Sequence, residues 1–313
     1  MAKNFEFDQL ATDFGNIQLT PGEKDKSSTI KVLSWNINGS SAAGMAEARK
    51  SILKSVIGDV DPDVMLLQET IKSIDSFFKD TGIPEKDYNY EKAEDERETR
   101  VIYKNNAFEK VDPSPVHLDT VLKKVPEEET KVLREGIVPE RRTIKNRICV
   151  VHLRHISTKR EIIFVSFHNI RHNGENIATK VCEIIASLHE SNECYVIAGV
   201  DFNCDIFEHK LVQVPPYTTT LRREDKVKVD YYILSNSTKT WEVKAIDLAP
   251  FHKKLQSEEF QMDLLNKAID HDPLQLSLSE VKREEEGKVK EEEEEGKKNV
   301  PEHFVNVCKD SII

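Results

Sequence analysis

The chain has 313 residues, a formal net charge of −11 and 38% hydrophobic residues, a composition typical of a globular protein with a large core. The negative charge argues against a protein that coats nucleic acid non-specifically, because such binding depends on many Lys and Arg residues. No apolar run approaches the roughly 20 residues of a membrane-spanning helix. The chain start has no basic region followed by an apolar one, so we expect neither a membrane span nor a secretory signal.

The cysteines are scattered and form no CxxC pair. They are Cys149, Cys182, Cys194, Cys204 and Cys308. An odd, scattered set is typical of reduced thiols in an intracellular protein. We therefore expect the protein to work in the cytoplasm or the nucleus. We also expect it to be a monomer.

The first predicted elements form a βαβ unit. Residues 1–28 are polar and without a period, so we expect a mobile arm. Residues 29–37 (TIKVLSWNI) predict a strand from their β-branched and aromatic side chains. Residues 45–57 place apolar side chains near one helical face, and residues 64–67 predict a short buried strand.

The middle of the chain predicts a hairpin and a long helix. A strand is expected at residues 99–106, followed by an irregular excursion at 112–145, where prolines and charges cluster. Residues 146–156 and 160–169 predict two strands around a short turn. Residues 176–190 place apolar side chains on one face, as in an amphipathic helix.

Further strands are expected at residues 194–199, 228–236 and 273–279. Beyond them the chain is a charged, low-complexity segment that cannot build a core. Hairpins mixed with a βαβ unit predict an α/β or α+β fold of roughly 250 residues. We expect one domain at residues 29–279 and a disordered tail at residues 280–313, which can bind a protein partner.

Polar side chains suited to catalysis or metal binding lie at the ends of the apolar strands. They are Asn36, Asn38, Gln68, Glu69, His168, Asn169, Asp201 and Asn203, with Asp270 and His271 before the last strand. Each one alone is more typical of a turn, but ligands collect at strand ends in open α/β sheets. Carboxylates, amides and histidines suit Mg²⁺ and a phosphate ester, whereas zinc is expected to recruit more His or Cys.

Five segments resemble, in chain order, the motifs of the endonuclease/exonuclease/phosphatase superfamily. They are LSWNING at 33–39, LLQET at 66–70, GVDFN at 199–203, VDYYILS at 229–235 and IDHDPLQL at 269–276. The superfamily includes DNase I, abasic-site endonucleases, deadenylases and inositol-polyphosphate phosphatases. The resemblance covers about residues 30–279 and implies a DNase I-like fold, a four-layer α/β/β/α sandwich of two mixed β-sheets flanked by helices.

The resemblance also implies a Mg²⁺-dependent phosphoester hydrolase, with Mn²⁺ as a substitute ion. It places Asn36 and Glu69 at the metal, with Glu69 as the principal ligand. Asp270 would complete the metal site directly or through water. A cation there would neutralise the anionic phosphodiester, which otherwise repels a nucleophile.

The same resemblance implies roles for the catalytic residues. Asp201 would orient and deprotonate the attacking water, and Asn203 would hydrogen-bond the phosphate or fix Asp201. His271 would face the phosphate while Asp230 holds it, which fixes the tautomer of the imidazole and favours its charged form. His168 matches a histidine that contacts the phosphate in many members of the superfamily.

Two positions depart from the family motifs. The usual Gly-Asp-x-Asn has Val200 in place of its glycine, with Gly199 one place earlier, and the usual Ser-Asp-His has Ile269 in place of its serine. A Val does not readily adopt positive φ, so either the turn is made differently or the motif glycine is needed mainly for space. Neither departure removes a reacting group.

The sequence leaves three functions open. The first and expected one is a nuclease or nucleic-acid phosphodiesterase. Its substrate contacts would come from Tyr103, Lys104, Arg171 and the basic residues of 141–147 and 222–223.

The second function is a phosphatase of inositol phosphates or of another small or lipid phosphoester. It would need a compact basic pocket or an apolar membrane-facing loop, and no long apolar loop is evident. The third is a non-catalytic binding module on the same fold. A binding module predicts the loss of Glu69, Asp201 or His271, and all three are present.

Overall fold

The computed structural model describes residues 29–39, 45–70, 73–94, 98–112, 131–133, 136–138, 140–169, 174–192, 194–204, 212–213, 229–234, 241–256, 260–269 and 271–278. All of them belong to the unit that spans residues 1–280, and a second unit spans residues 281–313. The predicted arm and tail lie outside the described residues, as do Arg171, Asp270 and Arg222–Arg223.

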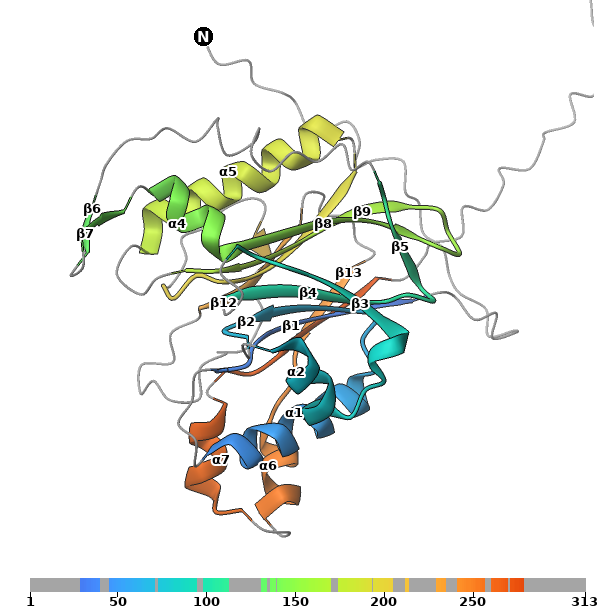
Figure 1. Cartoon of the computed structure of the whole chain (residues 1–313), viewed down its shortest axis with the longest axis vertical. Helices are drawn as coiled ribbons and strands as arrows, with labels where there is room; N and C mark the ends of the chain where they lie inside the picture. Colours follow the sequence, from blue (N-terminus) through green and yellow to red (C-terminus); the bar gives the residue numbers. More distant parts are fainter. Residues whose placement is uncertain are drawn as a thin grey trace, which may run out of the picture. The chain divides into compact units, whose positions relative to one another are not determined.

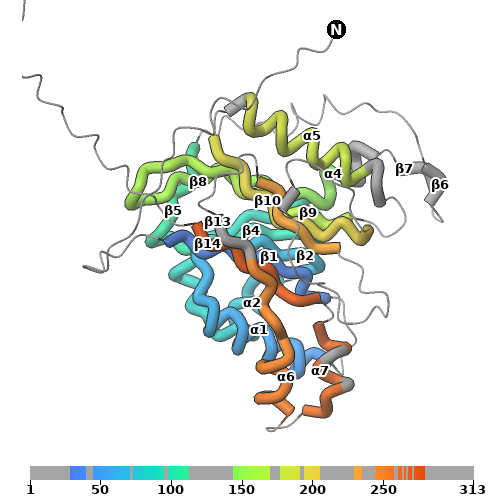
Figure 2. The backbone as a smooth tube through the Cα atoms, turned by 180° about the vertical axis from the view of Figure 1, so that it is seen from behind, coloured from blue at the N-terminus to red at the C-terminus, as the bar shows by residue number. Residues whose placement is uncertain are grey.

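The first of two six-stranded sheets, sheet A, has the strand order β13-β14-β1-β2-β4-β3 (Figures 1 and 2). Its strands are β1 (Ile30–Asn36), β2 (Val64–Gln68), β3 (Tyr88–Lys92), β4 (Thr99–Lys104), β13 (Trp241–Ala245) and β14 (Leu274–Leu278). β1 and β2 are parallel, which confirms the predicted βαβ unit. The other neighbouring pairs of sheet A are antiparallel.

Sheet B has the order β11-β12-β10-β9-β8-β5. Its strands are β5 (Phe108–Lys110), β8 (Ile148–His155), β9 (Glu161–His168), β10 (Tyr195–Asp201), β11 (Val212–Gln213) and β12 (Asp230–Leu234). β8 and β9 form the predicted hairpin, and β9 and β10 are a second parallel pair. A separate two-stranded sheet pairs β6 (Lys131–Leu133) with β7 (Gly136–Val138).

Helices cover the outer faces of both sheets (Figure 1). The helices on sheet A are α1 (Ala46–Val60), α2 (Ile74–Thr81), α6 (Ala249–Gln256) and α7 (Met262–Ala268). The helices on sheet B are α4 (Glu140–Arg147) and α5 (Gly174–Asn192). A 3₁₀ turn, η2 (Glu85–Asp87), precedes β3. The predicted four-layer α/β/β/α sandwich is confirmed. Of the helices in the part that the structure describes, none is long and apolar enough to cross a membrane.

Three apolar clusters hold the four layers together. One lies between sheet A and its helices, one between sheet B and its helices, and the third between the two sheets. Leu66 of sheet A and Phe164 of sheet B belong to the third cluster and are fully buried. Strands covered on both faces need apolar side chains on both, which explains why the central strands read as nearly unbroken apolar runs.

Several short elements were not predicted. They are α2, α4, α6, α7, η2, β3, β5, β6, β7, β11 and β13. β6, β7 and most of α4 lie within the excursion at 112–145 that was predicted to be irregular. Ile144 is the buried apolar residue of α4 among the side chains described there, so this two-turn helix has no readable apolar stripe. α2 begins where the Ser73 hydroxyl accepts from the Ser76 N–H and ends at Gly82, with φ of 72°.

Candidate active site

The carboxyl ends of the two parallel pairs meet at one edge of the sandwich, and Asn36 connects them. Its Nδ2 donates to Asp201 Oδ2 at 2.8 Å and to Glu69 Oε1 at 3.1 Å. Its Oδ1 accepts from the backbone N–H of Asn38 at 3.0 Å, which fixes the direction of the amide because a backbone N–H can only donate. Asn36 therefore presents its NH₂ group, and not its carbonyl oxygen, to the two carboxylates.

The backbone at this edge is held in an uncommon conformation. Asn38, Glu69 and Asn203 have φ of 48°, 46° and 52°, in the left-handed region. The Gly39 N–H donates to the Glu69 carbonyl, and a Cβ on Gly39 would lie 2.4 Å from that oxygen. Gly39 thus lets the loops after β1 and β2 approach, and residues held in such strained regions cluster at functional sites.

Asp201 ends β10 and is fully buried. Its Oδ1 accepts from the backbone N–H of Asn203 at 2.8 Å, and its Oδ2 from Asn36. The Asn203 side chain is fixed in turn, because its Nδ2 donates to the carbonyl of Asn169 at 2.8 Å and lies 3.1 Å from His168 Nε2. The carboxylate therefore has one orientation, set by the chain around it.

His168, Glu98 and Arg147 form a charged group beside Asp201. His168 Nδ1 lies 2.7 Å from Glu98 Oε2, and Arg147 Nη1 lies 2.8 Å from the same oxygen. Burial would raise the pKa of Glu98, but the hydrogen bond from His168 and the Arg147 charge outweigh it and hold this pKa below its usual value. The Nε2 of His168 lies 3.4 Å from Glu69 Oε1.

His271 and Asp230 form a second buried pair. His271 Nδ1 lies 2.7 Å from Asp230 Oδ2, and the His271 carbonyl accepts from Trp35 Nε1 at 2.8 Å. Asp230 begins β12 and pairs in register with Asp201 of β10. Ligand atoms of Asp201, Asp230 and His271 all lie within 4.8 Å of one another, so the pair adjoins the Asp201 carboxylate.

The first of the two departures, Val200 in place of the motif glycine with Gly199 one place earlier, has a structural reason. A Cβ on Gly199 would lie 2.3 Å from Ser34 Oγ and 2.6 Å from Ser34 Cβ on the facing sheet. Val200 continues β10, pairs with Tyr231, and is fully buried in the cluster beneath α5. The left-handed turn comes later, at Asn203. The glycine is therefore needed for space between the sheets, at position 199.

Seven of the predicted residues lie together: Asn36, Glu69, His168, Asp201, Asn203, Asp230 and His271. Asp270 and Arg171 fall outside the described residues. Glu98, Arg147 and Asn169 join the group although the sequence did not single out Glu98 or assign a role to Asn169. Arg147 was part of the basic segment 141–147.

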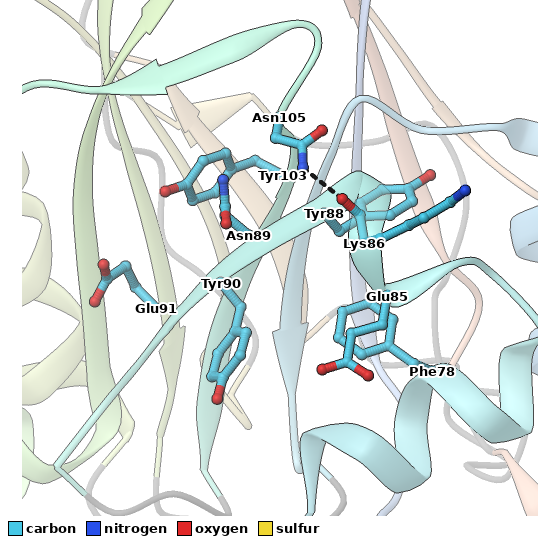
Figure 3. Close-up of a pocket in the computed structure, with 9 residues that line it drawn as sticks. All are labelled: Phe78, Glu85, Lys86, Tyr88, Asn89, Tyr90, Glu91, Tyr103 and Asn105. Carbon is cyan, nitrogen blue, oxygen red and sulfur yellow. Dashed lines mark hydrogen bonds between the residues drawn. The ribbon is translucent and has the colours of Figure 1, made fainter.

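The expectation that Tyr103 and Lys104 contact the substrate does not agree with their position. β4 is antiparallel to β2, so Tyr103 pairs with Val64, and Thr99 pairs with Gln68 beside Glu69. The separation along β4, 103 − 99 = 4 residues, is about 13 Å. Tyr103 instead lines a pocket of about 760 Å³ beside β3 (Figure 3).

Lys104 is occupied by other partners. Its Nζ lies 2.8 Å from Asp61 Oδ1 and 3.2 Å from Asp63 Oδ1. Burial would lower the pKa of Lys104, but these two carboxylates outweigh it and raise this pKa. Its charge is therefore paired at the opposite edge of sheet A from Glu69.

The donor set fits a divalent cation. Ligand atoms of Glu69, His168 and Asp201 lie within 4.8 Å of one another, and the Glu69 side chain is 26% exposed, so an ion can reach it. The carboxylates of Glu69 and Asp201 both accept hydrogen bonds from the Asn36 amide and so lie close together. A cation bound nearby would offset the repulsion between their negative charges. Oxygen donors of this kind suit Mg²⁺. The direction of the Asn36 amide makes it an orienting group for both carboxylates.

Comparisons with known proteins agree with the fold and with the motifs. The sequence model of the Endonuclease/Exonuclease/phosphatase family matches residues 33–221. No curated protein matches the chain.

Solved structures similar to this chain come from several organisms. Humanized D. rerio TDP2 is 13% identical, with a TM-score of 0.56 over 81% of this chain and 100% of that one. The human Nocturnin catalytic domain with bound sulfate anion is 17% identical, with a TM-score of 0.51 over 80% and 94%. The Bacteroides thetaiotaomicron mannosyl-6-phosphatase Bt3783 is 16% identical, with a TM-score of 0.52 over 80% and 100%. At these identities the likeness concerns the fold.

Proposed function

Because this chain belongs to the endonuclease/exonuclease/phosphatase family, we propose that it is a Mg²⁺-dependent phosphodiesterase that cleaves nucleic-acid backbones. Membership of the family indicates a phosphoester hydrolase, and the proposal adds the metal ion and the substrate class. One observation carries the proposal: a buried, oriented Asp201 lies between an accessible Glu69 and two histidines that each have an acidic partner. These are the groups that in-line attack of water on a phosphate requires.

Glu69 is the residue proposed to hold the ion. A bound Mg²⁺ would neutralise negative charge on the phosphate and fix its position. Asn36 keeps the carboxylates of Glu69 and Asp201 in place through its two N–H donors. Asp270 remains a proposed additional ligand, directly or through water.

Asp201 is proposed to act as the general base. Its Oδ1 accepts from the Asn203 backbone N–H at 2.8 Å, and its Oδ2 accepts from Asn36 at 2.8 Å and from the Asn203 side-chain amide at 3.5 Å. A lone pair therefore remains on Oδ1 for water. Since the carboxylate cannot rotate, a water bound to it is aligned for attack, and such assistance contributes roughly 10²–10⁴-fold. Asn203 fixes Asp201 through its backbone and points its side chain toward His168.

The two histidines are proposed to contact the phosphate through Nε2. An ionised carboxylate can accept a hydrogen bond but cannot donate one. Asp230 and Glu98 therefore each accept from Nδ1 of the partner histidine, which places the proton on that nitrogen. The acidic partner stabilises the imidazolium form and orients the ring. Negative charge that develops on the phosphate oxygens would then meet two positioned donors, with the Arg147 guanidinium next to His168.

Two observations favour nucleic acid as the substrate. D. rerio TDP2 complexed with single strand DNA product has the same fold, with 13% identity and a TM-score of 0.54 over 81% of this chain and 100% of that one. In addition, Arg147 lies beside His168 and supplies a cation where a backbone phosphate would pass.

A small phosphoester is the second candidate. The similar fold of a mannosyl-6-phosphatase supports it, and so does the paired charge of Lys104, which removes one expected contact to a long substrate. An inositol or sugar phosphate would occupy only the space around Glu69 and the histidines.

A substrate panel separates these candidates. Full-length protein with Mg²⁺ is assayed against single-stranded DNA, duplex DNA, RNA, 5′-tyrosyl DNA, an inositol phosphate and a sugar phosphate, with EDTA and Glu69→Gln as controls. We expect cleavage of a nucleic acid that EDTA abolishes and that Glu69→Gln shifts to higher Mg²⁺ concentration. Hydrolysis of the inositol or sugar phosphate alone would contradict the nuclease proposal while leaving the site assignment intact.

A further inference from the structure

His152, Glu161 and Cys194 gather at the edge of sheet B that lies away from the candidate active site. They come from three neighbouring strands: His152 from β8, Glu161 from the start of β9, and Cys194 from directly before β10. β9 runs from Glu161 to His168, which at about 3.3 Å per residue separates the two sites by about 23 Å. The cluster is therefore distinct from the site described above.

The distances within the cluster match those between the ligands of a tetrahedral metal. His152 Nε2 lies 3.1 Å from Glu161 Oε2 and 3.7 Å from Cys194 Sγ, and the three ligand atoms are all within 4.8 Å of one another. Zinc bond lengths to N, O and S place tetrahedral neighbours about 3.4 Å apart for N and O and about 3.6 Å apart for N and S. Shifts of a few tenths of an ångström would admit the ion.

His152 is an unusual residue to bury here. Its side chain is 0% exposed, and its Nδ1 has no hydrogen-bond partner within the described ranges. The neutral form of the imidazole is the one that binds a metal.

Arg154 holds Glu161 in the orientation that a ligand would need. Its Nη2 and Nε lie 2.6 Å and 3.2 Å from Glu161 Oε1, which leaves Oε2 directed at His152. Ligating carboxylates are commonly fixed by such outer partners. The Glu161 side chain is 32% exposed and Cys194 is partly buried, so the cluster is open to solvent on one side.

We propose that His152, Glu161 and Cys194 form a second metal site, which takes Zn²⁺ with water as its fourth ligand. A thiolate, an imidazole and a carboxylate favour zinc over magnesium, because thiolate is a soft ligand. Binding would release the thiol proton of Cys194. The ion would link β8, β9 and β10 and so stabilise sheet B.

The test uses Co²⁺ as a spectroscopic probe on the full-length protein in excess Mg²⁺. We expect a near-ultraviolet thiolate-to-Co²⁺ charge-transfer band that saturates at one equivalent and is lost when Zn²⁺ is added. Cys194→Ser should abolish the band. Cys204→Ser, which changes another partly buried free cysteine outside the cluster, should keep it, as should Glu69→Gln at the candidate active site.

A second measurement guards against a folding defect in Cys194→Ser. Glu161→Gln is expected to weaken Zn²⁺ binding more than about tenfold while its circular dichroism spectrum stays unchanged. Zn²⁺ should raise the melting temperature of the unmodified protein but not that of Glu161→Gln. The proposal is wrong if the unmodified protein shows no charge-transfer band. It is also wrong if the band survives in Cys194→Ser, or if Glu161→Gln binds Zn²⁺ as tightly as the unmodified protein.

Discussion

Glu98 contacts both His168 and Arg147, and its charge is proposed to orient the histidine. Glu98→Gln keeps the shape of the side chain but removes the charge that stabilises an imidazolium. We expect kcat to fall about 10- to 100-fold while KM changes little, because the interaction strengthens as charge develops on the phosphate. Steady-state kinetics with the preferred substrate from the panel measure this split.

Glu94→Gln is the matched control, because Glu94 lies in the same loop and pairs with Lys145 at 2.9 Å, away from His168. It should leave both constants unchanged. Equal losses in the two variants would mean that the loop, and not the Glu98 charge, matters.

Asp272 next to His271 gives the protein a pH-dependent stability. Burial, together with the charge of Asp247, raises the pKa of Asp272 to about 7, above an unfolded value of about 3.9. The folded state thus binds more protons between these values, so the free energy of unfolding falls as pH rises from about 4 to about 7. The full loss is on the order of 4 kcal/mol.

Asp272→Asn removes the carboxylate and should flatten this dependence. Urea unfolding at pH 5 and at pH 8 measures the effect, and we expect the variant to gain stability over the unmodified protein at pH 8. Asp247→Asn, on an exposed residue that caps α6, should flatten it only slightly. An identical pH dependence in Asp272→Asn and the unmodified protein would disprove the assignment.

At the scale of elements, strand direction decides which end of a strand reaches the site. β1, β2, β9 and β10 reach it with their carboxyl ends, whereas β4, β8, β12 and β14 are antiparallel to a neighbour among these and reach it with their starts. Glu98 and Arg147 immediately precede β4 and β8, so a search of residues that follow strands overlooks Glu98. Tyr103 and Lys104, which were expected to contact the substrate, lie at the end of β4 and therefore away from the site.

The two sheets approach closely at Gly199 and Ser34, and this contact yields a stability prediction. Gly199→Ala places a Cβ 2.3 Å from Ser34 Oγ, and we expect a loss of about 1–3 kcal/mol in the free energy of unfolding from overpacking. Ser34→Gly removes both clashing atoms, so the double variant should recover most of the loss attributable to Gly199→Ala. Urea unfolding of the single and double variants measures the coupling.

Val200→Gly restores the glycine of the family motif and provides the contrast. It deletes a fully buried side chain near the end of β10, so we expect a loss of about 2–4 kcal/mol in the free energy of unfolding and no gain in activity. A more active or more stable Val200→Gly protein would show that the family glycine has a role that Gly199 does not supply.

For the whole molecule, the sequence predicts the architecture well and the shorter elements poorly. Apolar runs in β1, β2, β9 and β10 and the apolar face of α5 can be read locally, and the motifs then imply two sheets. α4 and α7 are short, and they pack against helices far away in the sequence, α4 against α5 and α7 against α1. The orientation of the Asn36 amide likewise cannot be read from the sequence, because it depends on the hydrogen bond from the backbone N–H of Asn38.

The charged tail is predicted to be dispensable for folding and catalysis. Its charged, low-complexity composition cannot build a core. A chain that stops at Glu280 should melt within about 2 °C of the full-length protein and keep its kcat/KM. A large loss of either property would show that the tail belongs to the catalytic domain.

The most direct test of the proposed function is the rate of Mg²⁺-dependent phosphodiester cleavage by Asp201→Asn. Asn preserves the shape and a hydrogen-bond acceptor but cannot take a proton from water, so we predict a fall in kcat of at least about 10²-fold. Thermal melting should show that the variant remains folded. A folded Asp201→Asn protein that cleaves nucleic acid at the unmodified rate would contradict the proposed role of Asp201.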